Sequence, residues 1–89
     1  MMLNIYAVRD VKTGFMTPTF DQSDATAIRN FSHAVVNSDT ILSSYCKDFA
    51  LYRLGTYDND TGTLTPEPLP VHVYEAADAL RNFGGEDRV

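Results

Sequence analysis

Hydrophobic positions in the first part of the chain predict two strands joined by a turn. Residues 3–9 are rich in β-forming types, and residues 15–20 can return as a partner strand after a turn at residues 10–14. Asp10 can accept hydrogen bonds from the amides that follow it, and Gly14 can adopt the left-handed conformation that closes a hairpin. Pro18 has no amide hydrogen to donate, so we expect it at an edge or at the end of the strand.

Apolar residues then recur at helical spacing. Ser23 or Asp24 is a suitable N-cap. The apolar positions that follow are Ala25, Ile28, Phe31 and Val35, with Ala34 beside them. This spacing predicts a helix over residues 24–36. Arg29 and His33 lie four residues apart on the opposite face, where they point towards water or a partner.

The second half of the chain begins with a less regular segment. Residues 41–47 fit either a short helix or a loop. Residues 49–57 alternate as a strand, with Phe49, Leu51, Arg53, Gly55 and Tyr57 on one face and Ala50, Tyr52, Leu54 and Thr56 on the other. A second turn at residues 58–62 and a short return strand at 63–65 follow. The prolines at 66, 68 and 70 indicate a stiff, extended connector. Residues 71–74 are either a fifth strand or the start of a last helix over 76–83.

Two sequence motifs occur twice and in the same order. The pattern D-x-x-T-G-x-[ML]-T-P fits residues 10–18 and 58–66, and A-[IL]-R-N-F fits residues 27–31 and 79–83. Motifs repeated in the same order indicate an internal repeat, or two segments with the same structural role. It predicts a single domain over residues 1–89 with pseudo-repeat units at about 3–37 and 49–83. The fold class that follows is α+β: an antiparallel sheet of four or five strands from two strand-strand-helix units, with the helices packed on one face.

Composition and charge narrow the possible functions. The 89 residues leave room for one small domain, 44% hydrophobic, with a net charge of -5. An acidic chain is unlike a protein that coats nucleic acid along a basic face, although a local basic groove around Arg9, Arg29 and Arg53 is still possible. Cys46 is the single cysteine, which excludes a disulfide within the chain and fits a reducing compartment. Neither a signal peptide nor an apolar stretch of membrane-spanning length is present, so we expect a cytoplasmic protein without membrane contact.

Motifs that carry chemistry are missing from the sequence. His33 and His72 have no histidine or cysteine at zinc-ligand spacing. Residues 58–62 resemble the start of a calcium loop, but its twelfth position is Leu69 instead of Glu, and strands flank the turn. No nucleophile elbow, P-loop or dinucleotide fingerprint is present. We therefore expect no enzymatic activity, no metal and no cofactor.

Aromatic residues on the predicted strands are the remaining candidates for a binding surface. Tyr6, Tyr52, Tyr57, Phe15 and Phe49 lie on strands, and Arg9 and Arg53 are interleaved with them. Aromatic rings beside arginines on an open sheet are a surface on which single-stranded nucleic acid can stack. The same rings are also needed to fill the core of so small a domain. Both interpretations stay open at this point.

Several stretches resemble a known family. They are L-N-I-Y-A-V-R-D-V-K-T-G-F at 3–15, D-Q-S-D-A-T-A-I-R-N-F at 21–31, V-V-N-S at 35–38 and K-D-F-A-L-Y-R-L-G-T-Y-D-N-D-T-G at 47–62. Over roughly two thirds of its length the chain is similar to the small nonstructural protein of gokushoviruses, single-stranded DNA phages of the Microviridae. The stretch beyond Pro66 carries less of this likeness.

The resemblance implies a role in phage genome replication and a location in the cytoplasm of the bacterial host, outside the mature virion. Family members are described as nonstructural or, by analogy, as DNA-binding, and are likened to a protein that switches replication to single-stranded genome synthesis. Two hypotheses follow. In the first, the protein binds single-stranded DNA, with Arg9, Arg29 and Arg53 contacting phosphates and Tyr6, Tyr52 or Tyr57 stacking on bases. In the second, its acidic surface docks a basic phage or host replication or packaging protein without contacting DNA. Either hypothesis is compatible with a homodimer, because a small sheet leaves edges that invite pairing.

Overall fold

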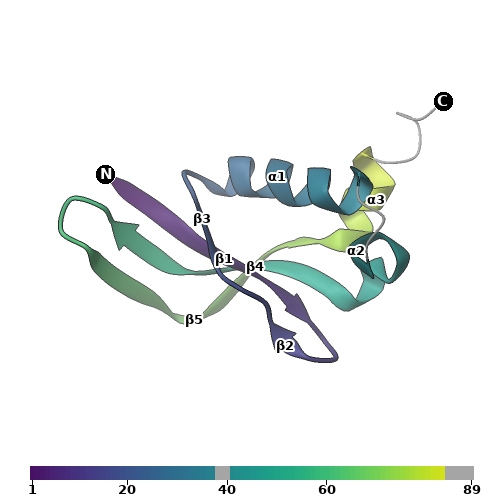
Figure 1. Cartoon of the computed structure of the whole chain (residues 1–89), viewed down its shortest axis with the longest axis horizontal. Helices are drawn as coiled ribbons and strands as arrows, with labels where there is room; N and C mark the ends of the chain where they lie inside the picture. Colours follow the sequence, from purple (N-terminus) through teal and green to yellow (C-terminus); the bar gives the residue numbers. More distant parts are fainter. Residues whose placement is uncertain (38–40, 84–89) are drawn as a thin grey trace.

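An antiparallel sheet with helices on one side forms the architecture of the protein (Figure 1). The computed structural model of the chain describes residues 1–37 and 41–83. The elements in chain order are β1 (Met2–Asp10), β2 (Gly14–Phe15), β3 (Thr19–Asp21), α1 (Asp24–Asn37), α2 (Ile41–Ser44), a 3-10 helix (Cys46–Asp48), β4 (Phe49–Asp58), β5 (Thr63–Glu75) and α3 (Ala76–Phe83). The five-stranded sheet has the order β2-β1-β4-β5, and β3 also pairs with β1. The predicted α+β fold is confirmed.

The two copies of the D-x-x-T-G motif form turns of the same construction. In each turn the aspartate side chain accepts a hydrogen bond from the amide two residues further on, at 2.9 Å for both Asp10 and Asp58. Each turn closes on a glycine with positive φ, 102° at Gly14 and 77° at Gly62. Glycine adopts this conformation without the steric cost that a Cβ would bring. The repeated motif therefore encodes a repeated turn.

The first return strand differs from the expectation of one strand over residues 15–20. It is divided into β2, which pairs with residues 9–10 of β1, and β3, which pairs with residues 4–6, and residues 16–18 lie outside the ladder. Pro18 lies in this break, as a residue without an amide hydrogen should. The expected strand is thus two short edge strands.

The long strand β4 contains a bulge that the alternation of its residues does not indicate. Tyr6 of β1 is opposite Arg53, but the preceding residue Ile5 is opposite Gly55, so Leu54 is an extra residue in β4. An extra residue reverses the faces of all positions beyond it. The expectation that Tyr57 shares a face with Arg53 is therefore wrong.

Strand β5 runs continuously through the three prolines. The expected connector at 66–70 and the ambiguous segment 71–74 both belong to it. Its pairing with β4 passes from Gly55 opposite Pro66 to Arg53 opposite Val71, so residues 67–70 arch out of the ladder. Proline is tolerated here because β5 is an edge strand whose outer side has no partner in the sheet. The other ambiguous segment, 41–47, is mostly helical, in α2 and the 3-10 helix.

Helix α1 begins at a reciprocal cap and buries part of the expected stripe, at Phe31 and Val35. The hydroxyl of Ser23 accepts from the amide of Thr26 at 3.2 Å, and the hydroxyl of Thr26 accepts from the amide of Ser23 at 3.2 Å. The buried apolar positions of the helix are Ala27, Phe31 and Val35, whereas the expected Ala25 is exposed and Ile28 is only half-buried. The helix is rotated relative to the prediction so that Ala27 rests close to the sheet.

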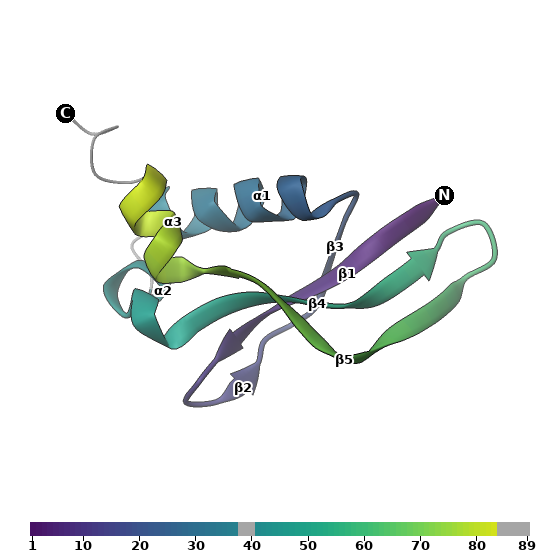
Figure 2. The same ribbon diagram turned by 180° about the vertical axis from the view of Figure 1, so that it is seen from behind.

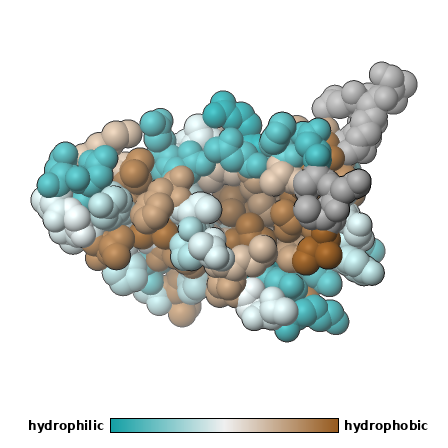
Figure 3. All heavy atoms as spheres, viewed as in Figure 1, coloured by the Kyte–Doolittle hydropathy of each residue, from teal (hydrophilic) through white to brown (hydrophobic). Residues whose placement is uncertain are grey.

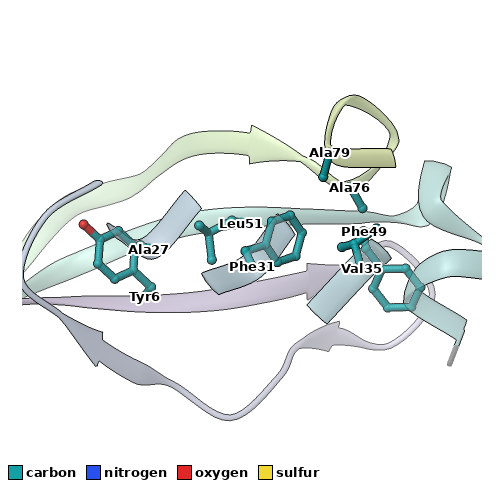
Figure 4. Close-up of a cluster of buried hydrophobic side chains, with 8 residues drawn as sticks. All are labelled: Tyr6, Ala27, Phe31, Val35, Phe49, Leu51, Ala76 and Ala79. Atoms are coloured by element: carbon teal, nitrogen blue, oxygen red, sulfur yellow. The ribbon is translucent and has the colours of Figure 1, made fainter. Parts of the chain in front are cut away.

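The core lies between the sheet and the two longer helices. It consists of Tyr6, Phe49 and Leu51 from the strands, Ala27, Phe31 and Val35 from α1, and Ala76 and Ala79 from α3 (Figure 4). The small alanines let both helices approach the sheet closely. The β4–β5 hairpin and the N-terminus lie at the end of the sheet opposite to α2 and α3 (Figures 1 and 2). No helix in the described part of the chain is long and apolar enough to cross a membrane.

Candidate nucleic-acid interface

The register of the sheet separates its residues into a face covered by helices and a face without them. Cross-strand partners in an antiparallel sheet lie on the same side. Tyr6 belongs to the core beneath the helices, so Ile5, Ala7 and Arg9 lie on the other side, called here the open face. The open face comprises Leu3, Ile5, Ala7, Arg9, Phe15, Phe20, Ala50, Tyr52, Gly55, Tyr57, Leu64, Pro66, His72 and Glu75.

One end of the open face carries a row of three rings from three strands, called here the Tyr52 cluster. Tyr52 of β4 meets the ring of Phe15 of β2 edge-on, with centroids 5.5 Å apart and an interplanar angle of 81°. On its other side it meets the ring of His72 of β5 at 5.4 Å and 88°. Arg9 is the cross-strand partner of Phe15 and is exposed. A cation therefore adjoins a row of rings that reaches solvent.

A second group of rings lies further along the open face and is called here the Tyr57 cluster. Phe20 of β3 packs against Tyr57 of β4 with centroids 5.4 Å apart and an interplanar angle of 61°. Half of the Phe20 surface, 51%, is exposed. Tyr57 is on this face only because the bulge at Leu54 reverses the alternation of β4. The bulge thus aligns Tyr52 and Tyr57 on one surface.

The open face is nearly free of the negative charge that dominates the chain. Among its residues only Glu75 carries a carboxylate, and that carboxylate lies 2.6 Å from the ring nitrogen Nε2 of His72. Arg9 has no ion pair within residues 1–37 and 41–83. The chain carries a net charge of -5, yet on this face the described residues leave the guanidinium of Arg9 without an ion pair, and the one carboxylate is partnered. An anionic ligand would meet less repulsion here than on the rest of the surface.

Two of the predicted contact residues have a structural role on the helix side of the sheet. Tyr6 is 1% exposed, and its hydroxyl donates to Oδ1 of Asp24 at 2.5 Å. The guanidinium of Arg53 donates to Oδ2 of Asp24 at 2.8 Å and to Oε2 of Glu67 at 3.0 Å. Because Tyr6 lies in the core, its ring is not accessible to a base, so its expected stacking role is wrong. Arg53 links the start of α1 to the arch of β5, because its guanidinium forms ion pairs with the carboxylates of Asp24 and Glu67.

This network shifts the protonation equilibria of its members. Burial, followed by the hydrogen bond to the Asp24 carboxylate, raises the pKa of Tyr6 to about 12. The Tyr6 hydroxyl and the Arg53 guanidinium together hold the pKa of Asp24 below its usual value. The pKa of Arg53 is raised, first by Glu67 and then by Asp24. All three shifts favour the charge states in which the network is complete.

The remaining predicted residue, Arg29, is exposed on α1 and so lies on the helix side of the sheet. The structure therefore brings Arg9, Tyr52 and Tyr57 to one face and places Tyr6, Arg29 and Arg53 elsewhere. Phe20 and His72 are not among the binding residues predicted from the sequence. Neither lies in an alternating run long enough to indicate which face of the sheet it occupies. The sequence does place Phe15 among the strand aromatics, and that ring belongs to the open face.

A hollow on the helix side of the sheet offers mainly apolar contacts. A groove of about 360 Å³ lies beneath α1 and is lined mainly by apolar side chains, among them Val8, Phe20, Phe31 and Leu51. Figure 3 shows hydrophobic residues gathered over the strands below α1 on this side of the molecule. Within residues 1–37 and 41–83, no group of three or more His, Cys, Asp or Glu side chains is placed to hold a metal ion.

Comparison with known proteins gives a family assignment. No curated protein and no solved structure matches the chain. A family model described as "Phage ORF5 protein" matches residues 3–79, which include all of the sheet except Met2, as well as α1 and the first half of α3. This span covers most of the chain and all residues of the open face. The chain therefore belongs to the Phage ORF5 protein family and is a phage protein.

Proposed function

We propose that the protein binds single-stranded DNA through the open face and acts, without catalysis, as an accessory protein in phage genome replication. The observation that carries this proposal is the pair of aromatic clusters beside Arg9 on a sheet face with one partnered carboxylate. Single-stranded nucleic acid binds to such surfaces by stacking bases on exposed rings while cations contact the phosphates. The family assignment supports a role in the phage life cycle.

The low charge of the open face supports this proposal for an otherwise acidic protein. The carboxylates of Asp24 and Glu67 that face Arg53 lie on the helix side or at the arch of β5. Repulsion between phosphates and these carboxylates is screened by salt, whereas stacking is not. We therefore expect moderate affinity with a shallow salt dependence, in contrast to the steep dependence of basic nucleic-acid-binding proteins.

Fluorescence anisotropy tests the proposal with a labelled oligothymidylate of about twelve nucleotides, within the usual site size of such proteins. The wild-type protein should bind the single strand more tightly than a duplex of the same length. Arg9→Gln should weaken binding and reduce the slope of log K against log salt by about 0.7, the value for one phosphate contact in a single strand. Arg29→Gln is the matched control, because it removes an exposed arginine from the helix side.

The outcomes separate the two functional hypotheses. An equal loss from Arg9→Gln and Arg29→Gln would contradict the open face as the binding surface. No binding to single strands at low salt would overturn the proposal. It would favour the alternative, in which the acidic surface docks a basic phage or host replication or packaging protein. Recovery of such a protein from nuclease-treated lysate would then support that alternative.

A further inference from the structure

We infer that one DNA strand contacts both aromatic clusters at once, so that the binding site has a minimum length of about four nucleotides. This inference rests on the proposed function and adds the length of the ligand and the difference between the two ends of its site. It follows from the positions of the clusters on β1. Phe15 is opposite Arg9, and Phe20 is opposite Ile5, four residues earlier on the same strand.

The separation of the two clusters follows from strand geometry. Four residues of an extended strand span about 13 Å. The corresponding rings of β4, Tyr52 and Tyr57, are five positions apart, but one of these positions is the extra residue of the bulge. Both strands therefore place the clusters at about the same interval. A stacked single strand advances about 3.4 Å per nucleotide, so about four nucleotides cover this distance.

The clusters also differ in the charge that accompanies them, which gives the site two unequal ends. The Tyr52 cluster adjoins the exposed guanidinium of Arg9. Near the Tyr57 cluster, the amino group of Met1 is already paired with the carboxylate of Asp60 at 2.5 Å. Phosphates are therefore held at the Arg9 end, while the Tyr57 end contributes stacking alone. The salt dependence of binding should arise at the Arg9 end, and the dependence on strand length at the Tyr57 end.

The proposed site is accessible at both clusters. Phe15 of the Tyr52 cluster is 45% exposed, and Phe20 of the Tyr57 cluster is 51% exposed. Each comes from a short edge strand, and neither belongs to the core cluster. Replacing either ring by leucine removes an aromatic surface without opening a buried cavity. These two positions therefore provide a matched pair of variants for the two ends of the site.

The test is a series of labelled oligothymidylates from about two to about twelve nucleotides, measured by anisotropy with the full chain. For the wild-type protein, affinity should rise steeply up to about four or five nucleotides and only slightly beyond. Phe20→Leu should weaken binding of the longer strands by about fivefold and leave the shortest strands and the salt slope unchanged. Phe15→Leu should weaken binding at every length. Phe83→Leu, at an exposed ring on α3, is the control and should change neither quantity.

The results distinguish this inference from the function on which it rests. If strands of all lengths fail to bind, the proposed function itself is overturned. If strands bind but affinity has no step near four nucleotides, or if Phe20→Leu acts equally at all lengths, the two-cluster site is wrong while single-strand binding stands. A circular dichroism spectrum and a thermal melt of each variant show that the loss does not come from unfolding.

Discussion

Gly55→Ala is expected to lower the free energy of unfolding by about 3 kcal/mol, near the upper end of the usual cost of overpacking. A Cβ added at Gly55 would lie 2.4 Å from the carbonyl oxygen of Thr65 and 2.9 Å from Cα of Pro66. Both obstacles are backbone atoms of β5, so no side-chain rotation can relieve the clash. The strands β4 and β5 would have to separate where residues 67–70 arch out of the ladder. Urea unfolding monitored by circular dichroism measures the change.

Gly62→Ala is the control for Gly55→Ala, because the two glycines are needed for different reasons. An added Cβ at Gly62 has no atom within 4 Å, but the positive φ of 77° makes the substitution strained. Its cost should be about 1 kcal/mol, from conformation alone. If Gly55→Ala cost no more than Gly62→Ala, the close approach of β4 and β5 at this position would be disproved.

Tyr6→Phe is expected to be the second most destabilising change, at about 2 kcal/mol. The variant keeps the buried ring but removes the hydroxyl that donates to the Asp24 carboxylate at 2.5 Å. A hydrogen bond to a charged group contributes about 1.5–3 kcal/mol, and the partial exposure of Asp24 places this bond in the lower part of that range. Tyr74→Phe is the matched control. The Tyr74 hydroxyl accepts an exposed hydrogen bond from Asn82, so its loss should cost less than 1 kcal/mol.

The pH dependence of stability provides a separate check on the Tyr6 variant. Because the folded-state pKa of Asp24 is lowered, its contribution is present above the unfolded value of about 4 and is lost as the pH falls through the folded value. The pKa of Tyr6 is raised to about 12, so its contribution is complete below about pH 10 and is lost between about pH 10 and 12. Tyr6→Phe should reduce the acid loss and remove the alkaline loss. An unchanged alkaline profile would show that the pKa of Tyr6 is not raised in the folded protein.

The elements of this fold follow from local signals in the sequence, whereas the two faces of the sheet do not. The turns at Asp10 and Asp58, the N-terminus of α1 and the strand character of β4 depend on residues close in sequence. The position of Tyr57 depends on the bulge at Leu54, which arises from pairing with β1 and leaves no mark in the alternation of β4. The sequence therefore indicates Phe15, Tyr52 and Tyr57 as strand aromatics, but it does not indicate Phe20 and His72 and it places Tyr57 on the wrong face.

The misassignment of Tyr6 has a related cause. Both sides of β1 carry apolar residues, with Ile5 and Ala7 on one side and Tyr6 and Val8 on the other. Alternation alone cannot tell which side the helices cover, because that choice depends on contacts between elements far apart in the chain. The hydroxyl of Tyr6 meets Asp24, 18 residues later, and Arg53 meets the same carboxylate from 29 residues further on. Such contacts become visible only in the folded chain.

The prolines of β5 have a consequence for the behaviour of the protein at high concentration. An exposed edge strand can act as a template for further strands and so start aggregation. Pro66, Pro68 and Pro70 remove every second amide hydrogen from the middle of this edge. A strand from another molecule would find no regular row of donors there, and the arch at residues 67–70 would hold it away from the ladder. These prolines make β5 hard to recognise as a strand in the sequence. They also oppose the polymerisation of this small phage protein through pairing of its sheet edges.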